Sequence, residues 1–233
     1  MHTFFCDAFG GAGTHPVLEA RERDHLFKTL RARPGEELRL FDGRGGIARA
    51  RVLPGRELEI LTAERCVPPA RNLLLYTAVP RRAKFDVLLK QAAELGVGAI
   101  QPVECERSVA QPEGSSRWTT LLQEGCKQSG NPFLPEIRAP LTLGEAVARL
   151  RSEGVAMFFG AVARTGEPSA PPPPAGDLAW FVGPEGGFTG GEERMLRGAG
   201  VRGLHLGPYI LRLETAAVCG LAVLRQWMEE GRS

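Results

Sequence analysis

The feature that most constrains this sequence is a series of short, almost unbroken apolar runs separated by segments with helical periodicity. The runs are NLLLYTAV at 72–79, VGAIQPV at 97–103, VAMFF at 155–159 and LAWFV at 178–182. An apolar run without alternation is typical of a strand that is buried on both faces. Strands that alternate with helices predict an α/β fold with a largely parallel sheet.

The helices between these strands are predicted from apolar spacing and from end signals. Residues 85–95 have helical spacing and stop at Gly96, a residue type that often ends a helix. The remaining predicted elements are helices at 118–128, 145–150 and 214–228, a helix near Glu192, and a strand at 203–206. Residues 169–176 (SAPPPPAG) are expected to form a Pro-rich surface loop.

The first 70 residues have the pattern of a small β-rich domain. LRLF at 38–41 and IARARVL at 47–53 flank a Gly-rich turn, which predicts a hairpin. A further strand is expected at 58–61 and a short helix at 22–30. Pro68-Pro69 stiffens the chain, so we expect a domain junction there, with domains at 1–70 and 71–233.

Composition excludes several classes of protein. Hydrophobic residues are 43% and charged residues 24%, as in globular domains. The longest apolar stretch, at 216–224, is shorter than the ~20 residues of a membrane helix, and no signal peptide is visible. We therefore expect a cytoplasmic protein without membrane contact. The five cysteines form no CxxC pair and the four histidines do not cluster with carboxylates, so no metal site is expected.

Positive charge is concentrated near the start of the chain. The formal net charge is only +2, but ten lysines and arginines face five acids between Arg21 and Arg56. A second basic group comprises Arg71, Arg81, Arg82, Lys84 and Lys90. A local excess of this kind suits a polyanion such as RNA, although a solvated arginine-rich surface gives the same pattern.

Two glycine-bearing loops follow strands near the end of the chain. In FVGPEGGFT (181–189) the glycines let the backbone approach a ligand, or allow a tight connection to the next helix. LGPYILRLETAA (206–217) offers free N–H groups at a helix start and an apolar slot for a flat ring. Neither loop contains GK[ST] or GxGxxG, which disfavours a nucleotide-phosphate enzyme.

These two loops resemble the signature loops of the RsmE family, which are ribosomal RNA uridine-N3 methyltransferases of the SPOUT superfamily. The resemblance covers essentially the whole chain. It includes His25, LRARPGE at 30–36, LFDG at 40–43, Lys84, ELGV at 94–97, IQP at 100–102, ERS at 106–108, Trp118, KQSG at 127–130 and PEI at 135–137. The chain departs from the family at Tyr209 and Asn131, where arginine is common, and in a Pro-rich insert at 171–174.

The resemblance implies an N-terminal PUA-like β-barrel that binds RNA and a C-terminal SPOUT α/β methyltransferase domain with a trefoil knot. The two loops would form the knot around S-adenosylmethionine. The implied activity is methylation of N3 of a uridine in the decoding region of 16S ribosomal RNA, by a homodimer acting on the small ribosomal subunit. Because N3 lies on the Watson–Crick edge, the target must be unpaired or flipped out. The alternatives are a SPOUT enzyme for another ribosomal or transfer RNA nucleotide, and a non-catalytic RNA-binding module.

Particular residues follow from this resemblance as candidates. The cofactor-binding candidates are Gly160, Val182, Gly183, Pro184, Glu185, Gly186, Leu206, Gly207, Ile210, Leu211, Leu213 and Thr215. Arg212 is the first candidate for an electrostatic role in catalysis, against a salt bridge to Glu214 or Glu185. Glu185 is a general base or a loop-stabilising carboxylate. The RNA-binding candidates, each of which is alternatively a plain surface or helix-end residue, are His25, Arg31, Arg33, Lys84, Gln128 and Ser129.

Overall fold

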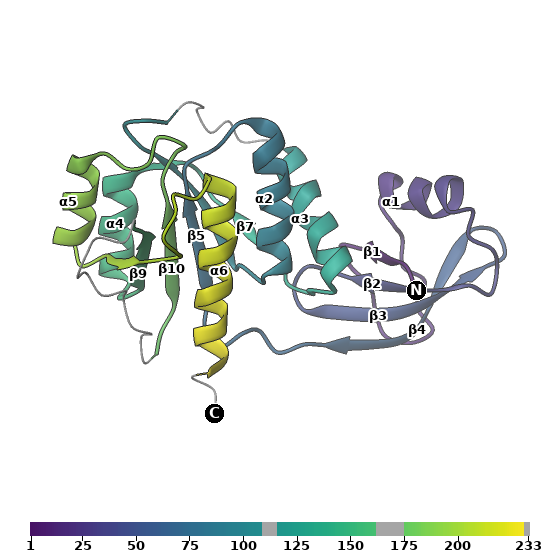
Figure 1. Cartoon of the computed structure of the whole chain (residues 1–233). Helices are drawn as coiled ribbons and strands as arrows, with labels where there is room; N and C mark the ends of the chain where they lie inside the picture. The colour runs from purple at the N-terminus through teal and green to yellow at the C-terminus, as the bar shows by residue number, and fades with distance from the viewer. Residues whose placement is uncertain (109–115, 162–174, 231–233) are drawn as a thin grey trace. The chain divides into compact units, whose positions relative to one another are not determined.

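The structure is a computed structural model that describes residues 1–108, 116–161 and 175–230 (Figure 1). The chain forms two compact units, one made of Met1–Pro69 with Gln123–Leu134 and the other of Ala70–Leu122 with Pro135–Ser233. The first division falls beside the Pro68-Pro69 pair. Residues 123–134, which sequence patterning assigned to the second domain, pack with the N-terminal unit instead. The Pro-rich insert at 171–174 lies outside the described residues.

The N-terminal unit contains a four-stranded sheet in the order β1-β2-β3-β4. Its strands are β1 (Thr3–Phe5), β2 (Glu37–Phe41), β3 (Gly46–Leu53) and β4 (Glu57–Arg65). Strands β2 and β3 form the predicted antiparallel hairpin, with Phe41 opposite Ile47, and β1 adds to β2 in parallel. The helix predicted at 22–30 is an α-helix, α1 (Ala20–Asp24), continued by a π-helical segment, η1 (His25–Thr29).

The C-terminal unit contains a parallel sheet, which confirms the predicted α/β class. The strand order is β11-β9-β10-β5-β6-β7, and β8 pairs with the end of β6. The strands are β5 (Leu73–Thr77), β6 (Ala99–Glu104), β7 (Glu136–Ile137), β8 (Leu141–Thr142), β9 (Ala156–Gly160), β10 (Leu178–Val182) and β11 (Arg202–Leu204). The central strands β5 and β10 are buried along their whole length.

Helices cover both faces of this sheet. Their bounds are α2 (Arg82–Glu94), α3 (Ser116–Ser129), α4 (Leu143–Ser152), α5 (Gly190–Gly198) and α6 (Leu213–Glu230). Helices α2 and α6 lie together on one face, and α4 and α5 lie on the other (Figure 1). Helix α2 ends as predicted, with Gly96 at a φ of 69°, a conformation that glycine adopts without strain.

Alternate residues of β10 serve the two faces. Ala179 and Phe181 belong to the apolar cluster that includes Leu150 of α4 and Leu196 of α5. Trp180 contacts α6 on the opposite face. Because both faces are covered, the sheet presents its functional groups at the strand ends.

None of the helices in the described part of the chain is long and apolar enough to cross a membrane. No group of three or more His, Cys, Asp or Glu side chains there is placed to hold a metal ion.

Candidate functional site

The carboxyl ends of β9 and β10 open onto a cavity of about 400 Å³ within the C-terminal unit. Gly160 and Val182 contribute the strand ends, while residues 183–188 and 206–211 contribute the two loops. Ligands of open α/β sheets bind in this position, and the volume is typical of small-molecule sites. The two glycine-bearing loops singled out in the sequence therefore border one cavity.

Most of the predicted cofactor-binding residues line this cavity. They are Gly160, Val182, Gly183, Pro184, Glu185, Gly186, Leu206, Gly207, Ile210, Leu211 and Leu213. Thr215 is exposed on α6 and is not part of the lining, and neither is Arg212. The lining also contains residues that were not predicted, namely Ala161, Trp180, Phe181, Gly187, Phe188, Glu193, Tyr209 and Ala216. Trp180 and Phe181 belong to the apolar run at 178–182, which indicated core positions only, whereas Gly187, Phe188 and Tyr209 belong to the two loops singled out in the sequence.

The first loop turns back on itself after β10. The Gly187 N–H donates a hydrogen bond to the Pro184 carbonyl oxygen at 2.8 Å, and Gly187 has a φ of 68°. A Cβ atom at Gly183 would lie 3.1 Å from the Phe188 nitrogen and 3.2 Å from its ring. The close return of Phe188 over the strand end therefore leaves little room for a side chain at position 183.

Residues 105–108 support the first loop. The Arg107 guanidinium donates to the Gly186 carbonyl oxygen at 2.7 Å. The Glu106 N–H donates to Glu192 Oε1 at 2.8 Å, and Glu192 Oε2 accepts from the Thr189 N–H at 2.7 Å. Sequence reasoning included ERS at 106–108 in the family resemblance but assigned it no role. These contacts join residues that are 79 and 86 positions apart in the sequence. They therefore cannot be predicted from a local sequence pattern.

Glu192 is the buried centre of this support, with 7% of its surface exposed. It forms a capping box with Thr189 at the start of α5, an arrangement that pairs otherwise free N–H groups. Burial, reinforced by the nearby Glu192 carboxylate, raises the pKa of the Cys105 thiol to about 12. Cys105 is therefore a neutral packing residue next to the site.

The second loop presents unpaired backbone donors. Within the described residues, the N–H groups of Leu206, Gly207, Ile210 and Leu211 make no hydrogen bond. Gly207 has a φ of 144°, which side-chain-bearing residues rarely adopt. Backbone donors that are not paired within the protein and border a cavity suit a ligand with hydrogen-bond acceptors.

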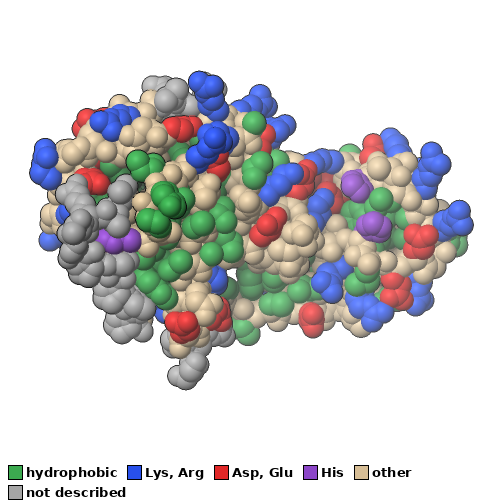
Figure 2. Space-filling model, viewed as in Figure 1, with side chains coloured by type: hydrophobic (Ala, Val, Ile, Leu, Met, Phe, Trp, Pro, Cys, Tyr) green, Lys and Arg blue, Asp and Glu red, His purple; other side chains and the backbone are tan. Residues whose placement is uncertain are grey.

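The mouth of the cavity is apolar. Tyr209 and Ile210 are 81% and 85% exposed. Figure 2 shows hydrophobic side chains gathered on this face over α6 and beside it. Exposed aromatic and aliphatic side chains next to a ligand cavity indicate a surface that meets another molecule.

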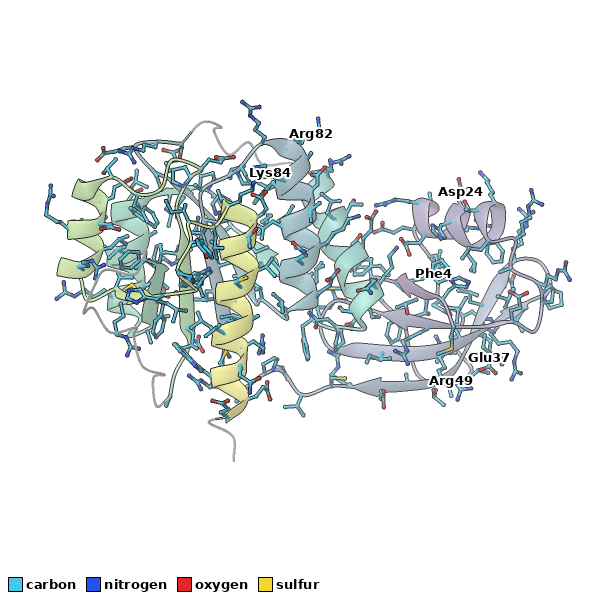
Figure 3. All side chains as sticks on the ribbon, in the orientation of Figure 1. Phe4, Asp24, Glu37, Arg49, Arg82 and Lys84 are labelled. Carbon is cyan, nitrogen blue, oxygen red and sulfur yellow. The ribbon has the colours of Figure 1, made fainter. Side chains whose placement is uncertain are left out.

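Neither candidate catalytic residue is engaged in an internal contact. Arg212 and Glu185 are exposed, and their side chains make no ion pair or hydrogen bond within the described residues. Glu214 pairs instead with Lys84 at 3.4 Å. Lys84 lies near the start of α2 (Figure 3). The salt bridge from Arg212 to Glu214 or Glu185, one of the two readings of Arg212, is therefore not formed. The side chain of Lys84, which was predicted to bind RNA, is therefore held by Glu214 in the first turn of α6.

The other RNA-binding candidates lie in the N-terminal unit, where two of them come together. His25 and Gln128 border a hollow of about 320 Å³ whose remaining lining residues are Arg21, Glu22, Glu124 and Lys127. The Ser129 hydroxyl donates to the Gly125 carbonyl oxygen at 2.9 Å, a helix-end contact. Arg31 and Arg33 are exposed and lie outside this hollow.

A buried ion pair organises that hollow. Lys127 Nζ lies 2.8 Å from Glu22 Oε1, and the other Glu22 oxygen accepts from the Phe5 N–H at 3.1 Å. Only 5% of the Glu22 surface is exposed. Breaking one partner of such a pair leaves a buried charge, so the contact fixes residues 123–134 to α1.

Two family models match this chain. The model described as RNA methyltransferase domain matches residues 68–225, and the model described as RNA methyltransferase PUA domain matches residues 18–61. The ribosomal RNA small subunit methyltransferase E of Mycobacterium bovis is 31% identical over 237 residues, covering 95% of this chain and 90% of the relative.

Solved structures with high similarity include two that contain a bound cofactor. The crystal structure of a ribosomal RNA small subunit methyltransferase E from Neisseria gonorrhoeae bound to S-adenosyl methionine is 31% identical. It aligns with a TM-score of 0.86 over 97% of each chain. The putative methyltransferase of Legionella pneumophila in complex with the bound cofactor SAM is 27% identical, with a TM-score of 0.80 over 96% of each chain.

Proposed function

We propose, on the premise that this chain belongs to the RNA methyltransferase family whose model matches residues 68–225, that it methylates N3 of a uridine in 16S ribosomal RNA of the small ribosomal subunit. The methyl donor is S-adenosylmethionine. The observation that carries this proposal is the cavity bordered by both glycine-bearing loops, where four backbone donors of one loop have no partner among the described residues.

The residues at the cavity fit S-adenosylmethionine. When bound, this cofactor supplies a methyl group already activated by a sulfonium. The N–H groups of Leu206, Gly207, Ile210 and Leu211 would hold the adenine ring through its nitrogen acceptors. Residues 183–186 would line the ribose and methionine portion, with Gly160 as a third wall. The apolar lining of Trp180 and Leu213 keeps water from that space.

Arg212 and Glu185 are the proposed groups at the uridine. Uridine N3 carries a proton at neutral pH, and its removal places negative charge on O2 and O4. A guanidinium near those oxygens lowers the barrier, and Arg212 is unpaired within the described residues. Glu185 borders the cavity and makes no side-chain hydrogen bond to its loop there, which supports a base role over a loop-stabilising one.

The wider assembly is also a proposal. We infer that the N-terminal unit binds the RNA, with His25, Arg31, Arg33 and Gln128 among its contacts. We infer a cytoplasmic homodimer in which a second copy meets the exposed Tyr209 and Ile210 beside α6. The trefoil knot rests on the RsmE resemblance alone.

The test combines cofactor binding with mapping of the modified nucleotide. Calorimetry with S-adenosylmethionine should give heat of binding to the purified chain, because an RNA-binding module without catalysis would give none. Mass mapping of ribosomal RNA from cells that lack the gene should then show loss of one N3-methyluridine from 16S RNA. Loss of a methyl group elsewhere would indicate a different substrate, and an unchanged map would refute the proposed activity.

A further inference from the structure

A second cavity, of about 450 Å³, lies within the N-terminal unit and has no part in the proposed methyl transfer. It is formed by residues 15–18, the helical segment around Phe27 and the turn from β3 to β4. The lining residues are His15, Pro16, Val17, Leu18, Arg23, Phe27, Arg56, Glu57 and Leu58. Two arginines and a histidine face one carboxylate, so the lining favours a ligand with negative charge.

Phe27 and Arg56 face each other across part of this cavity. The guanidinium carbon of Arg56 is 6.0 Å from the centre of the Phe27 ring. That distance is the outer limit of a cation–π contact, and direct contact needs about 3.5–4 Å. A planar ring between the two requires roughly 7 Å, or two contacts of about 3.5 Å. A small rotation of the exposed Arg56 side chain would therefore admit one flat ring.

The two walls of this slot differ in burial. Phe27 is half-buried and packs against the apolar cluster of the N-terminal unit, which fixes its ring. Arg56 is exposed and has a φ of 65°, a left-handed conformation that favours glycine. The turn geometry therefore does not favour arginine here, and residues held in such conformations cluster at functional sites.

His15, another lining residue, is held in place by a backbone contact. Because a carbonyl oxygen can only accept, the 3.0 Å contact means that His15 Nδ1 donates to the Leu58 oxygen. The strand-like hydrogen bonds of Gly13 and Thr14 with Ile60, at 2.8 and 2.9 Å, fix this segment beside β4. Within the described residues His15 Nε2 has no partner and remains for a ligand.

We propose that this cavity holds one unpaired nucleotide of the RNA substrate, with its base stacked between Phe27 and Arg56. Arg23 and His15 are the groups for its phosphate, and the Glu57 carboxylate accepts from a ribose hydroxyl or a base amino group. Stacking on aromatic rings and guanidinium planes is the usual way that proteins hold unpaired bases of RNA. The inference rests on the proposed function only in taking the ligand to be RNA.

The test uses the full-length chain and two RNA probes. One is a 16S ribosomal RNA transcript, and the other is a single-stranded pentanucleotide with 2-aminopurine at its centre. The variants are Phe27→Leu, which keeps an apolar side chain against the core, and Arg56→Gln. Each should weaken transcript binding roughly 5- to 150-fold, the range for loss of one stacking contact to a base. Wild-type protein should quench the 2-aminopurine fluorescence, and both variants should lose that quenching.

The control variant is Arg151→Gln, which removes the same charge from the exposed end of α4. It should leave both readouts unchanged. Arg56→Gly separates binding from folding, because glycine suits a φ of 65°. This variant should melt at the wild-type temperature or above it and still lose RNA affinity.

The outcomes separate this inference from the proposed function. Unchanged transcript affinity and unchanged quenching in Phe27→Leu and Arg56→Gln would overturn the nucleotide site, even if wild-type protein methylates RNA normally. Failure of the proposed function would instead appear as wild-type protein without methyl transfer. An Arg56→Gly variant that is destabilised but keeps its RNA affinity would show that Arg56 is structural, which also overturns the site.

Discussion

The indole Nε1 of Trp180 donates a hydrogen bond to the backbone oxygen of Ala216 at 3.2 Å. This contact joins β10, which leads into the first loop, to the start of α6, which follows the second loop. Trp180 is completely buried, and both residues line the cofactor cavity. The positions of the two loops therefore depend on how closely α6 approaches the ring.

Gly220 permits that approach, one turn further along α6. A Cβ atom at this position would overlap the Trp180 indole. Overpacking against a rigid ring destabilises the fold by up to about 3 kcal/mol. The higher helix propensity of alanine relative to glycine offsets about 1 kcal/mol of this loss. We expect Gly220→Ala to lower the free energy of unfolding by about 2 kcal/mol in urea titrations and to weaken binding of S-adenosylmethionine.

Gly144→Ala in α4 is the matched control, because a Cβ atom there meets nothing within 4 Å. Its free energy of unfolding should stay the same or rise by roughly 0.5 kcal/mol. Equal stabilities for Gly220→Ala and the wild type would contradict the close packing of α6 on Trp180.

The two capping boxes offer a second comparison. Glu192 is buried and accepts from the Thr189 and Glu106 N–H groups, whereas Glu145 is exposed and caps α4 alone. Glutamine at 192 would turn one acceptor into an NH₂ group that faces a donor. A buried group left unsatisfied costs about 1–3 kcal/mol, so Glu192→Gln should be destabilised by that amount in urea.

Glu145→Gln should have a smaller effect, because water can replace the lost contact. Glu192→Gln should also weaken binding of S-adenosylmethionine, since Glu192 anchors the segment that holds Gly186 through Arg107. Equal losses of stability in the two variants would show that burial of Glu192 contributes nothing.

The main strands could be predicted because a strand that is buried on both faces has a continuous run of apolar residues, as in LAWFV of β10. The strands β1 and β8 were missed, because strands this short have almost no periodicity, and β7 was expected only from the family resemblance of PEI at 135–137. The assignment of residues 123–134 to the N-terminal unit was missed as well. It depends on contacts such as Glu22 with Lys127, which are 105 residues apart.

The site was predictable where the loops contain glycines that allow unusual backbone conformations and close approach, as at 181–189 and 206–217. It was not predictable where a side chain acts through a distant partner. Trp180 has the pattern of a core residue, and its place in the cavity comes from α6 packing. Arg107 has the pattern of a surface residue, and its contact with Gly186 depends on the sheet.

Stability at high pH should reflect a buried thiol. Burial raises the pKa of Cys126 from its ordinary value of 9.0 to about 12. Below pH 9 the thiol is protonated in both states, so its contribution is fully present. Between pH 9 and about 12 only the unfolded chain releases the proton. The free energy of unfolding therefore falls as pH rises, by up to about 1.4 kcal/mol per pH unit for this group.

Cys126→Ala removes this contribution. Its unfolding curve between pH 8 and 10.5 should be flatter than that of the wild type, as followed by urea titration at each pH. Cys219→Ala, at an exposed position, should keep the wild-type slope. Parallel curves for Cys126→Ala and the wild type would refute the proposed coupling.

Arg212 provides the most direct test of the proposed chemistry. Glu214, its nearest candidate partner in sequence, is paired with Lys84, so Arg212 is available to the substrate. Removal of one group that stabilises developing negative charge typically costs 10²–10³ in kcat. We expect Arg212→Ala to lose roughly that factor in methyl transfer to 16S RNA, while calorimetry shows unchanged affinity for S-adenosylmethionine.

Arg212→Lys should recover part of the rate, because it keeps the charge but not the planar fork. Arg194→Ala, on the exposed side of α5, should leave both quantities unchanged. Wild-type turnover in Arg212→Ala would exclude Arg212 from the reaction and leave Glu185 as the remaining candidate.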